Sequence, residues 1–78
     1  MSWNQKRQLE TVLHQQILLN PQGIDTRTLI TQVINMLSSQ MPLTRQRVSG
    51  MLGWVIKRYG HQFLVRQPGG PSVILWNL

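Results

Sequence analysis

The chain has 78 residues, 41% of them hydrophobic and 6% aromatic, with no cysteine, and its eight Lys or Arg against two acids give a formal net charge of +6. A chain of this length buries only about 60% of its unfolded surface in one core, which excludes a multi-domain enzyme and predicts a single domain over residues 1–78. The lack of cysteine excludes disulfides and thiolate zinc sites, and the charge favours a polyanionic partner.

The first predicted element is a helix from about Trp3 to Leu19. Ser2 and Gln5 have the spacing of a capping box, in which each side chain bonds to the backbone N–H of the other residue. Apolar residues then recur at helical spacing, at Leu9, Val12, Leu13 and Ile17. Asn-Pro-Gln-Gly at 20–23 ends this amphipathic helix, because proline cannot continue the hydrogen-bond ladder.

A second helix is predicted from Thr26 to Leu37. Asp25 suits the N-cap position, and Ile24 and Leu29 have the spacing of a hydrophobic staple across the helix start. The apolar residues of this segment form one broad stripe, made of Leu29, Ile30, Val33, Ile34 and Leu37. Residues 38–42 have the composition of a loop.

A third helix is predicted from Arg45 to Tyr59, because Thr44 can cap its start and Gly60 can end it. At about 100° per residue, one narrow sector must face the core, and it contains Val48, Leu52, Val55 and Tyr59. The opposite side is centred on Gln46, Gly50, Gly53 and Lys57, with Arg47 and Trp54 beside it and Arg45 and Ser49 on the flank. The outward side is therefore a mixed basic and amide surface that is free for a partner.

Two short segments rich in β-forming residues follow, at 62–67 and 72–77. Pro-Gly-Gly-Pro at 68–71 separates them. This pattern predicts a β-hairpin with a tight, uncharged tip and with Arg66 as the cation near its base.

Three segments carry a resemblance in architecture. They are the extended segment 22–24 before the Asp25 cap, the opening of the third helix at 44–47, and the hairpin at 63–76. With the order of the elements, they resemble the winged helix-turn-helix family of DNA-binding domains over nearly the whole chain, from Ser2 to Asn77. The resemblance implies an α+β fold of three helices followed by a two-stranded β-hairpin wing. It also implies that the third helix lies in the major groove and that the wing touches the flanking backbone or minor groove.

The predicted function is non-catalytic binding of double-stranded DNA, by a transcriptional regulator or a DNA-maintenance accessory factor. Arginine can bond guanine and glutamine can bond adenine in the major groove, so Arg47 and Gln46 are expected to read bases. Lys57 and Arg58 are expected to contact phosphates. The full set of expected DNA-binding residues is Thr44, Arg45, Gln46, Arg47, Ser49, Gly50, Lys57, Arg58 and Arg66. Because one module covers few base pairs, a homodimer or a larger assembly is expected.

Two other functions remain open. Gly50 and Gly53 each cost a helix about 1 kcal/mol relative to alanine, and the close approach of a DNA backbone or of another protein helix would explain them. Trp54 at their edge favours a protein that docks on this face if its side chain is exposed. RNA binding is a third reading, although no aromatic RNA-recognition signature is present.

The remaining residues predict no further site. Trp3 and Trp76 are expected to pack in the core or at its edge, and His14 and His61 to be ordinary surface residues without a metal. Neither a paired carboxylate nor a nucleophile motif is present, so no catalysis and no cofactor are expected. The apolar runs are too short to span a bilayer and the N-terminus lacks a signal-peptide pattern, which predicts a cytoplasmic protein.

Overall fold

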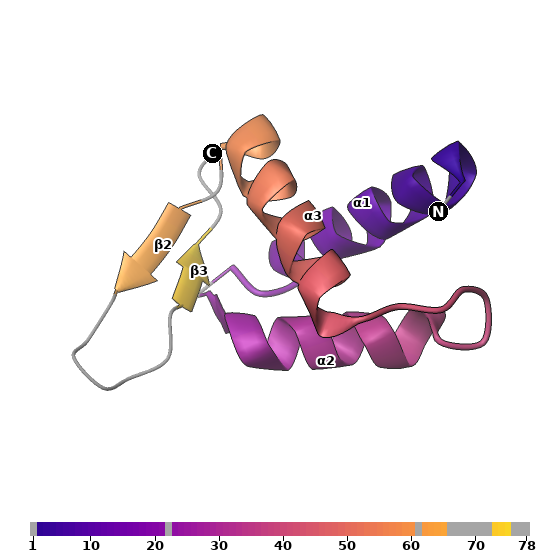
Figure 1. Ribbon diagram of the computed structural model, residues 1–78. Coiled ribbons are helices and arrows are strands. Elements are labelled where there is room, and N and C mark those ends of the chain that lie inside the picture. Colours follow the sequence, from indigo (N-terminus) through magenta and orange to yellow (C-terminus); the bar gives the residue numbers. More distant parts are fainter. Residues whose placement is uncertain (1, 22, 61, 66–72, 76–78) are drawn as a thin grey trace.

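The computed structural model describes residues 2–21, 23–60, 62–65 and 73–75 (Figure 1). In chain order its elements are α1 (Trp3–Leu18), β1 (Ile24–Asp25), α2 (Thr26–Leu37), α3 (Arg45–Tyr59), β2 (Gln62–Val65) and β3 (Val73–Leu75). The three helices pack against one another in all three pairings. The positions of the three predicted helices are thus confirmed, the first to within one residue.

The starts of α1 and α2 follow the predicted capping chemistry. The Ser2 hydroxyl accepts a hydrogen bond from the Gln5 backbone N–H at 3.3 Å, and the Gln5 side-chain oxygen accepts one from the Ser2 N–H at 3.0 Å. The Asp25 carboxylate accepts from the Thr28 backbone N–H at 3.0 Å. Each bond satisfies an amide that the first helical turn would otherwise leave without a partner.

The start and end of α3 are also as predicted. The Thr44 hydroxyl accepts a hydrogen bond from the Arg47 backbone N–H at 3.1 Å. Gly60 follows the last turn with φ of 73°, a left-handed conformation that glycine adopts without the penalty of a Cβ. α3 is therefore fixed at both ends by its own sequence.

The core lies between the three helices. Its buried residues are Leu9, Leu13 and Ile17 from α1, Ile24 from β1, Leu29, Ile30, Val33 and Leu37 from α2, Met41 from the loop, and Val48, Leu52 and Val55 from α3. Tyr59 is an exception to the predicted core sector of α3, because it is 38% exposed. It lies in the last turn, where its ring stacks on His14 at the edge of the core with ring centroids 3.9 Å apart.

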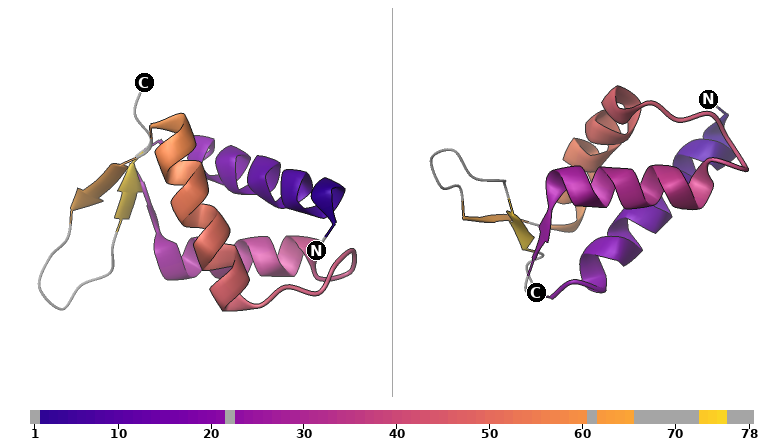
Figure 2. Two further views of the ribbon diagram at one scale, coloured as in Figure 1. Left: turned by 45° about the horizontal axis from the view of Figure 1, so that its top comes forward. Right: turned by 90° about the horizontal axis from the view of Figure 1, so that it is seen from below.

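The predicted fold class, a winged helix-turn-helix with a two-stranded wing, is wrong. The described chain is mostly helical, and its short strands form one antiparallel sheet in the order β1-β3-β2, with Ile74 paired to both Ile24 and Phe63. The sheet lies beside the start of α2 and the end of α3 (Figure 2). The strands after α3 are therefore not a freestanding hairpin, because β1 pairs with β3.

The added strand has a local cause and a distant partner. Asp25 is extended (φ −62°, ψ 133°) because it caps α2, and the extended backbone of Ile24 and Asp25 can pair with a strand. The sequence indicated the extended segment, but no local pattern indicated a partner near the other end of the chain. The predicted hairpin tip, together with Arg66, Trp76 and His61, lies outside the described residues.

Candidate nucleic-acid interface

The outward face of α3 is exposed as the helical spacing predicted. Gln46, Gly50, Gly53 and Lys57 all face solvent on the side opposite to the buried Val48, Leu52 and Val55. A Cβ built on either glycine would meet no atom within 4 Å. Nothing in the described part of the fold therefore requires glycine at these two positions.

The charge of this face is entirely positive. α3 contains no acidic residue, and the chain has only Glu10 and Asp25. Asp25 caps α2, while Glu10 accepts bonds from the side chains of Arg58 and Tyr59, each at 3.2 Å. Both acids are thus engaged within the fold, and neither neutralises the outward face of α3.

Arg47 and Lys57 are the available cations of the outward face. Both are exposed, and within the described ranges neither side chain makes a hydrogen bond or an ion pair. Arg47 is in the first turn of α3 next to Gln46, and Lys57 is in the last turn. They could each bond to an external anion without breaking an internal contact.

Two other predicted DNA contacts are engaged inside the protein. Arg45 donates hydrogen bonds to the Thr31 hydroxyl at 2.9 Å and to the Arg27 carbonyl at 3.2 Å, so it ties the start of α3 to α2. Arg58 pairs with Glu10 of α1. Among the remaining predicted residues, the Thr44 hydroxyl is occupied as the helix cap, and Ser49 is exposed on the flank of α3.

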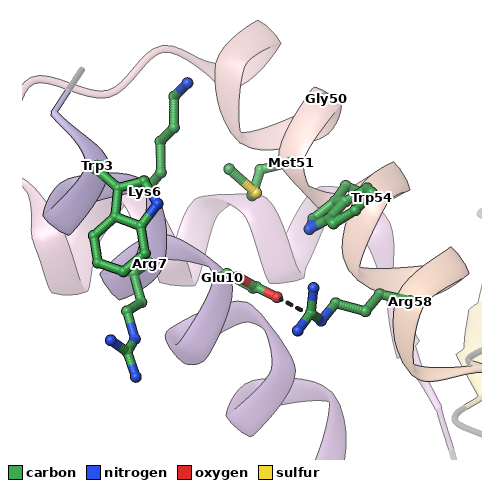
Figure 3. A pocket seen from close by; sticks show the side chains of 8 residues that line it. All are labelled: Trp3, Lys6, Arg7, Glu10, Gly50, Met51, Trp54 and Arg58. Atoms are coloured by element: carbon green, nitrogen blue, oxygen red, sulfur yellow. Dashed lines mark ion pairs between the residues drawn. The ribbon is translucent and has the colours of Figure 1, made fainter.

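Sequence reasoning missed a groove between α1 and α3 (Figure 3). Its volume is about 730 Å³. It is lined by Trp3, Lys6, Arg7 and Glu10 from α1 and by Gly50, Met51, Trp54 and Arg58 from α3. We call this the α1/α3 groove.

The two tryptophans of the α1/α3 groove are exposed. Trp3 is 70% exposed, so the expectation that it packs in the core or at its edge is wrong, and Trp54 is 51% exposed. In Figure 3 they lie on opposite sides of the groove, with Met51 between them. The guanidinium of Arg7 lies 5.5 Å from the ring centroid of Trp3, and that of Arg58 lies 5.8 Å from that of Trp54. Each ring therefore has a cation beside it.

The spacing of residues could have indicated this groove. On α1 the residues that face α3 recur at intervals of about one helical turn, at Trp3, Arg7, Glu10 and His14. On α3 the same spacing joins Met51, Trp54 and Arg58. These stripes lie beside the core stripe, and a search for apolar periodicity alone passes over them because they combine aromatic and charged residues.

His14 closes one end of the contact between α1 and α3 by stacking on Tyr59 at an interplanar angle of 19°.

Over the described ranges, no group of three His, Cys, Asp or Glu side chains could hold a metal ion. None of the described helices has the length and apolar character that a bilayer span needs.

A scan against models of known protein families finds no match, and neither a search of curated proteins nor one of solved structures finds a similar chain.

Proposed function

We propose that the protein binds double-stranded DNA without catalysis and does so through the outward face of α3. The observation that carries the proposal is the acid-free outward face of this helix, on which Arg47 and Lys57 lack partners among the described residues and two glycines open the surface. The net charge of +6 supports a polyanionic ligand. We place the protein in the cytoplasm, as a transcriptional regulator or DNA-maintenance factor.

The dimensions of α3 suit the major groove. Its 15 residues make a rod about 22 Å long. A major groove about 12 Å wide admits a helix whose diameter with side chains is about 10–12 Å. Gly50 and Gly53 have no side chain, so they leave the backbone uncovered on the outward face in the middle of α3. There the helix backbone would come nearest to the base pairs.

The residues on this face have separate proposed roles. Gln46 and Arg47, in the first turn, are proposed to read base edges through paired hydrogen bonds. Lys57, in the last turn, is proposed to contact phosphate. Arg45 and Arg58 are not among the proposed DNA contacts, because each already bonds to another helix. One helix reads only a few base pairs, so the protein is proposed to bind as a homodimer on two half-sites.

Salt-dependent binding to labelled duplex DNA, measured by fluorescence anisotropy, tests the proposal. About four phosphate contacts would give a slope of log affinity against log salt near −3.6. Lys57→Ala should reduce the magnitude of that slope by about 1 and weaken all sequences alike. Arg47→Ala and Gln46→Ala should instead relax the preference between sequences.

Lys6→Ala is the matched control, because it removes the same charge from α1 and leaves the outward face of α3 intact. Its affinity should stay within about twofold of the parent chain. Single-stranded DNA and RNA of the same length complete the comparison. The proposal fails if the duplex does not bind at low salt, or if the folded Arg47→Ala variant keeps both its affinity and its sequence preference.

A second candidate function is protein docking, which the exposed Trp54 and the open surface at Gly50 favour. Gly53 does not line the α1/α3 groove, so this candidate now depends on Gly50 and Trp54 together with residues of α1.

A further inference from the structure

We propose that the α1/α3 groove binds an acidic segment of a partner protein, which inserts one bulky apolar side chain between Trp3 and Trp54. The proposal specifies the partner of the docking candidate above and does not require DNA binding. Of the four residues at the centre of the outward face of α3, only Gly50 lines the groove, and Trp54 lies at the border of the two surfaces.

The size and lining of the groove suit an apolar anchor. Its volume of about 730 Å³ is within the usual range for binding pockets, roughly 300–1,000 Å³. Met51 lies half-buried between two exposed tryptophans, and the flexible thioether of methionine adapts to different side chains. Tryptophan, methionine and arginine are the residue types enriched in the centres of protein interfaces.

Gly50 gives the partner room to approach. It lies inside α3, where glycine costs about 1 kcal/mol relative to alanine. A Cβ at this position would meet no atom of the described residues within 4 Å, so their packing does not require the glycine. A partner backbone that crosses α3 at Gly50 would use the space that any larger side chain fills.

The charges around the groove select an acidic partner. Lys6 is exposed and has no partner among the described residues, and Arg7 is exposed beside Trp3. The one acid of the groove, Glu10, is already paired with Arg58 (Figure 3). It also accepts a hydrogen bond from the Tyr59 hydroxyl. The unpaired rim is therefore cationic, and acidic residues on both sides of an apolar anchor would complement it.

The same charges argue against a second copy of the chain as the occupant. A copy would bring a further net charge of +6, and its two acids are engaged as the cap of α2 and as the partner of Arg58. A single-stranded nucleic acid could stack bases on tryptophan. The apolar Met51 between the two tryptophans favours an apolar side chain of a protein segment over a phosphate backbone.

The test uses the full chain and a set of labelled acidic peptides. Each peptide is a 16-residue helix former rich in glutamate and alanine, and the peptides differ only in a central Phe, Leu or Ala. Binding is measured by anisotropy and by the intrinsic tryptophan fluorescence of the protein. The Phe and Leu peptides should bind about tenfold or more tightly than the Ala peptide, because only they carry the anchor.

Two pairs of variants locate the site. Gly50→Leu should weaken the Phe peptide about tenfold or more, whereas Gly53→Leu, the same change one turn away and outside the groove, should leave it within about twofold. Lys6→Glu should weaken the peptide, while Lys57→Glu should not. A Cβ at either position meets no described atom within 4 Å, and a thermal melt of each variant verifies that the helices remain folded.

The proposal is overturned if no peptide binds up to about 1 mM, a free energy of only about −4 kcal/mol. It is overturned equally if the Ala peptide binds as well as the Phe peptide, or if Gly50→Leu has no effect. If oligothymidine binds, competes with the peptide and loses affinity in Gly50→Leu, the groove is a nucleic-acid site and the protein partner is wrong.

Discussion

The starts of α1 and α3 are built on the same capping pattern but complete it differently. At α1, Ser2 and Gln5 bond reciprocally and satisfy two backbone amides. At α3, Thr44 makes the first of these bonds, but the position of the reciprocal side chain holds Arg47, a cation at the positive end of the helix dipole. The start of α1 therefore has a complete capping box, whereas that of α3 lacks the reciprocal bond.

The interiors of the two helices differ in the same direction. α1 contains no glycine, whereas α3 contains Gly50 and Gly53, and open space surrounds both. A helix that gives up about 2 kcal/mol of its own propensity must be held by the core, through Val48 and its buried neighbours. The comparison teaches that, of α1 and α3, the positions that least favour a helix are Gly50 and Gly53. Both lie on the outward face of α3, where a ligand would contact them.

The largest expected effect on DNA affinity comes from Arg47→Glu. The change would complete a capping box with Thr44 and place an acid at the positive end of α3, so unfolding should cost about 0.5–1 kcal/mol more. Duplex DNA affinity should fall by about tenfold to more than 100-fold, since a bidentate base contact worth about 1–3 kcal/mol is replaced by a repulsion. Urea titration and anisotropy on the same sample would measure both. A variant that loses stability together with DNA affinity would break the contrast between α1 and α3.

The next effect is that of the double variant Gly50→Ala and Gly53→Ala. Since added methyl groups meet nothing within 4 Å, the free energy of unfolding should rise by about 2 kcal/mol. Duplex affinity should fall severalfold, because the helix backbone is held away from the bases. Comparing each single variant with the double one in urea would show whether the two contributions add. A loss of stability would mean that the space over the glycines is not open in solution.

The smallest effect on DNA affinity is expected at the start of α1. Ser2→Ala removes the capping oxygen and should lower the free energy of unfolding by about 1 kcal/mol, while DNA affinity stays unchanged. Thr44→Ala is the matched change at α3, and it should cost a similar amount of stability and also weaken DNA binding, because it loosens the first turn that carries Gln46 and Arg47. Equal effects of the two variants on DNA affinity would remove the distinction between the two helix starts.

The local features of this fold were readable in the sequence. The caps at Ser2, Asp25 and Thr44 and the stop at Gly60 depend on residues within one turn of each other, so the helix ends could be predicted to within one residue. The burial of three of the four residues in the core sector of α3 follows from the helical period in the same way. Tyr59 differs because the core ends before the last turn does.

The features that could not be predicted all join distant segments. The helical period indicates which side of α3 carries Arg45 and Arg58. It does not indicate that Arg58 pairs with Glu10 or that Arg45 bonds to Thr31. The α1/α3 groove and the exposure of Trp3 depend on how two helices are placed relative to each other, which no local pattern specifies. β1 was not predicted as a strand, because its two residues, Ile24 and Asp25, are too few to give a strand pattern of their own.

The pairing of β1 with β3 has a consequence for the order of folding. Short loops join α1 to α2 and α2 to α3, whereas α1 meets α3 across a long separation, as between Glu10 and Tyr59. The pairing of Ile24 with Ile74 closes a similarly long stretch of chain, but only two residues of β1 take part in it, whereas the helices share the buried core. Such a pairing becomes favourable only after the helices have brought its ends together. The helical core should therefore form in the early kinetic phase, and β3 should join β1 in the last step.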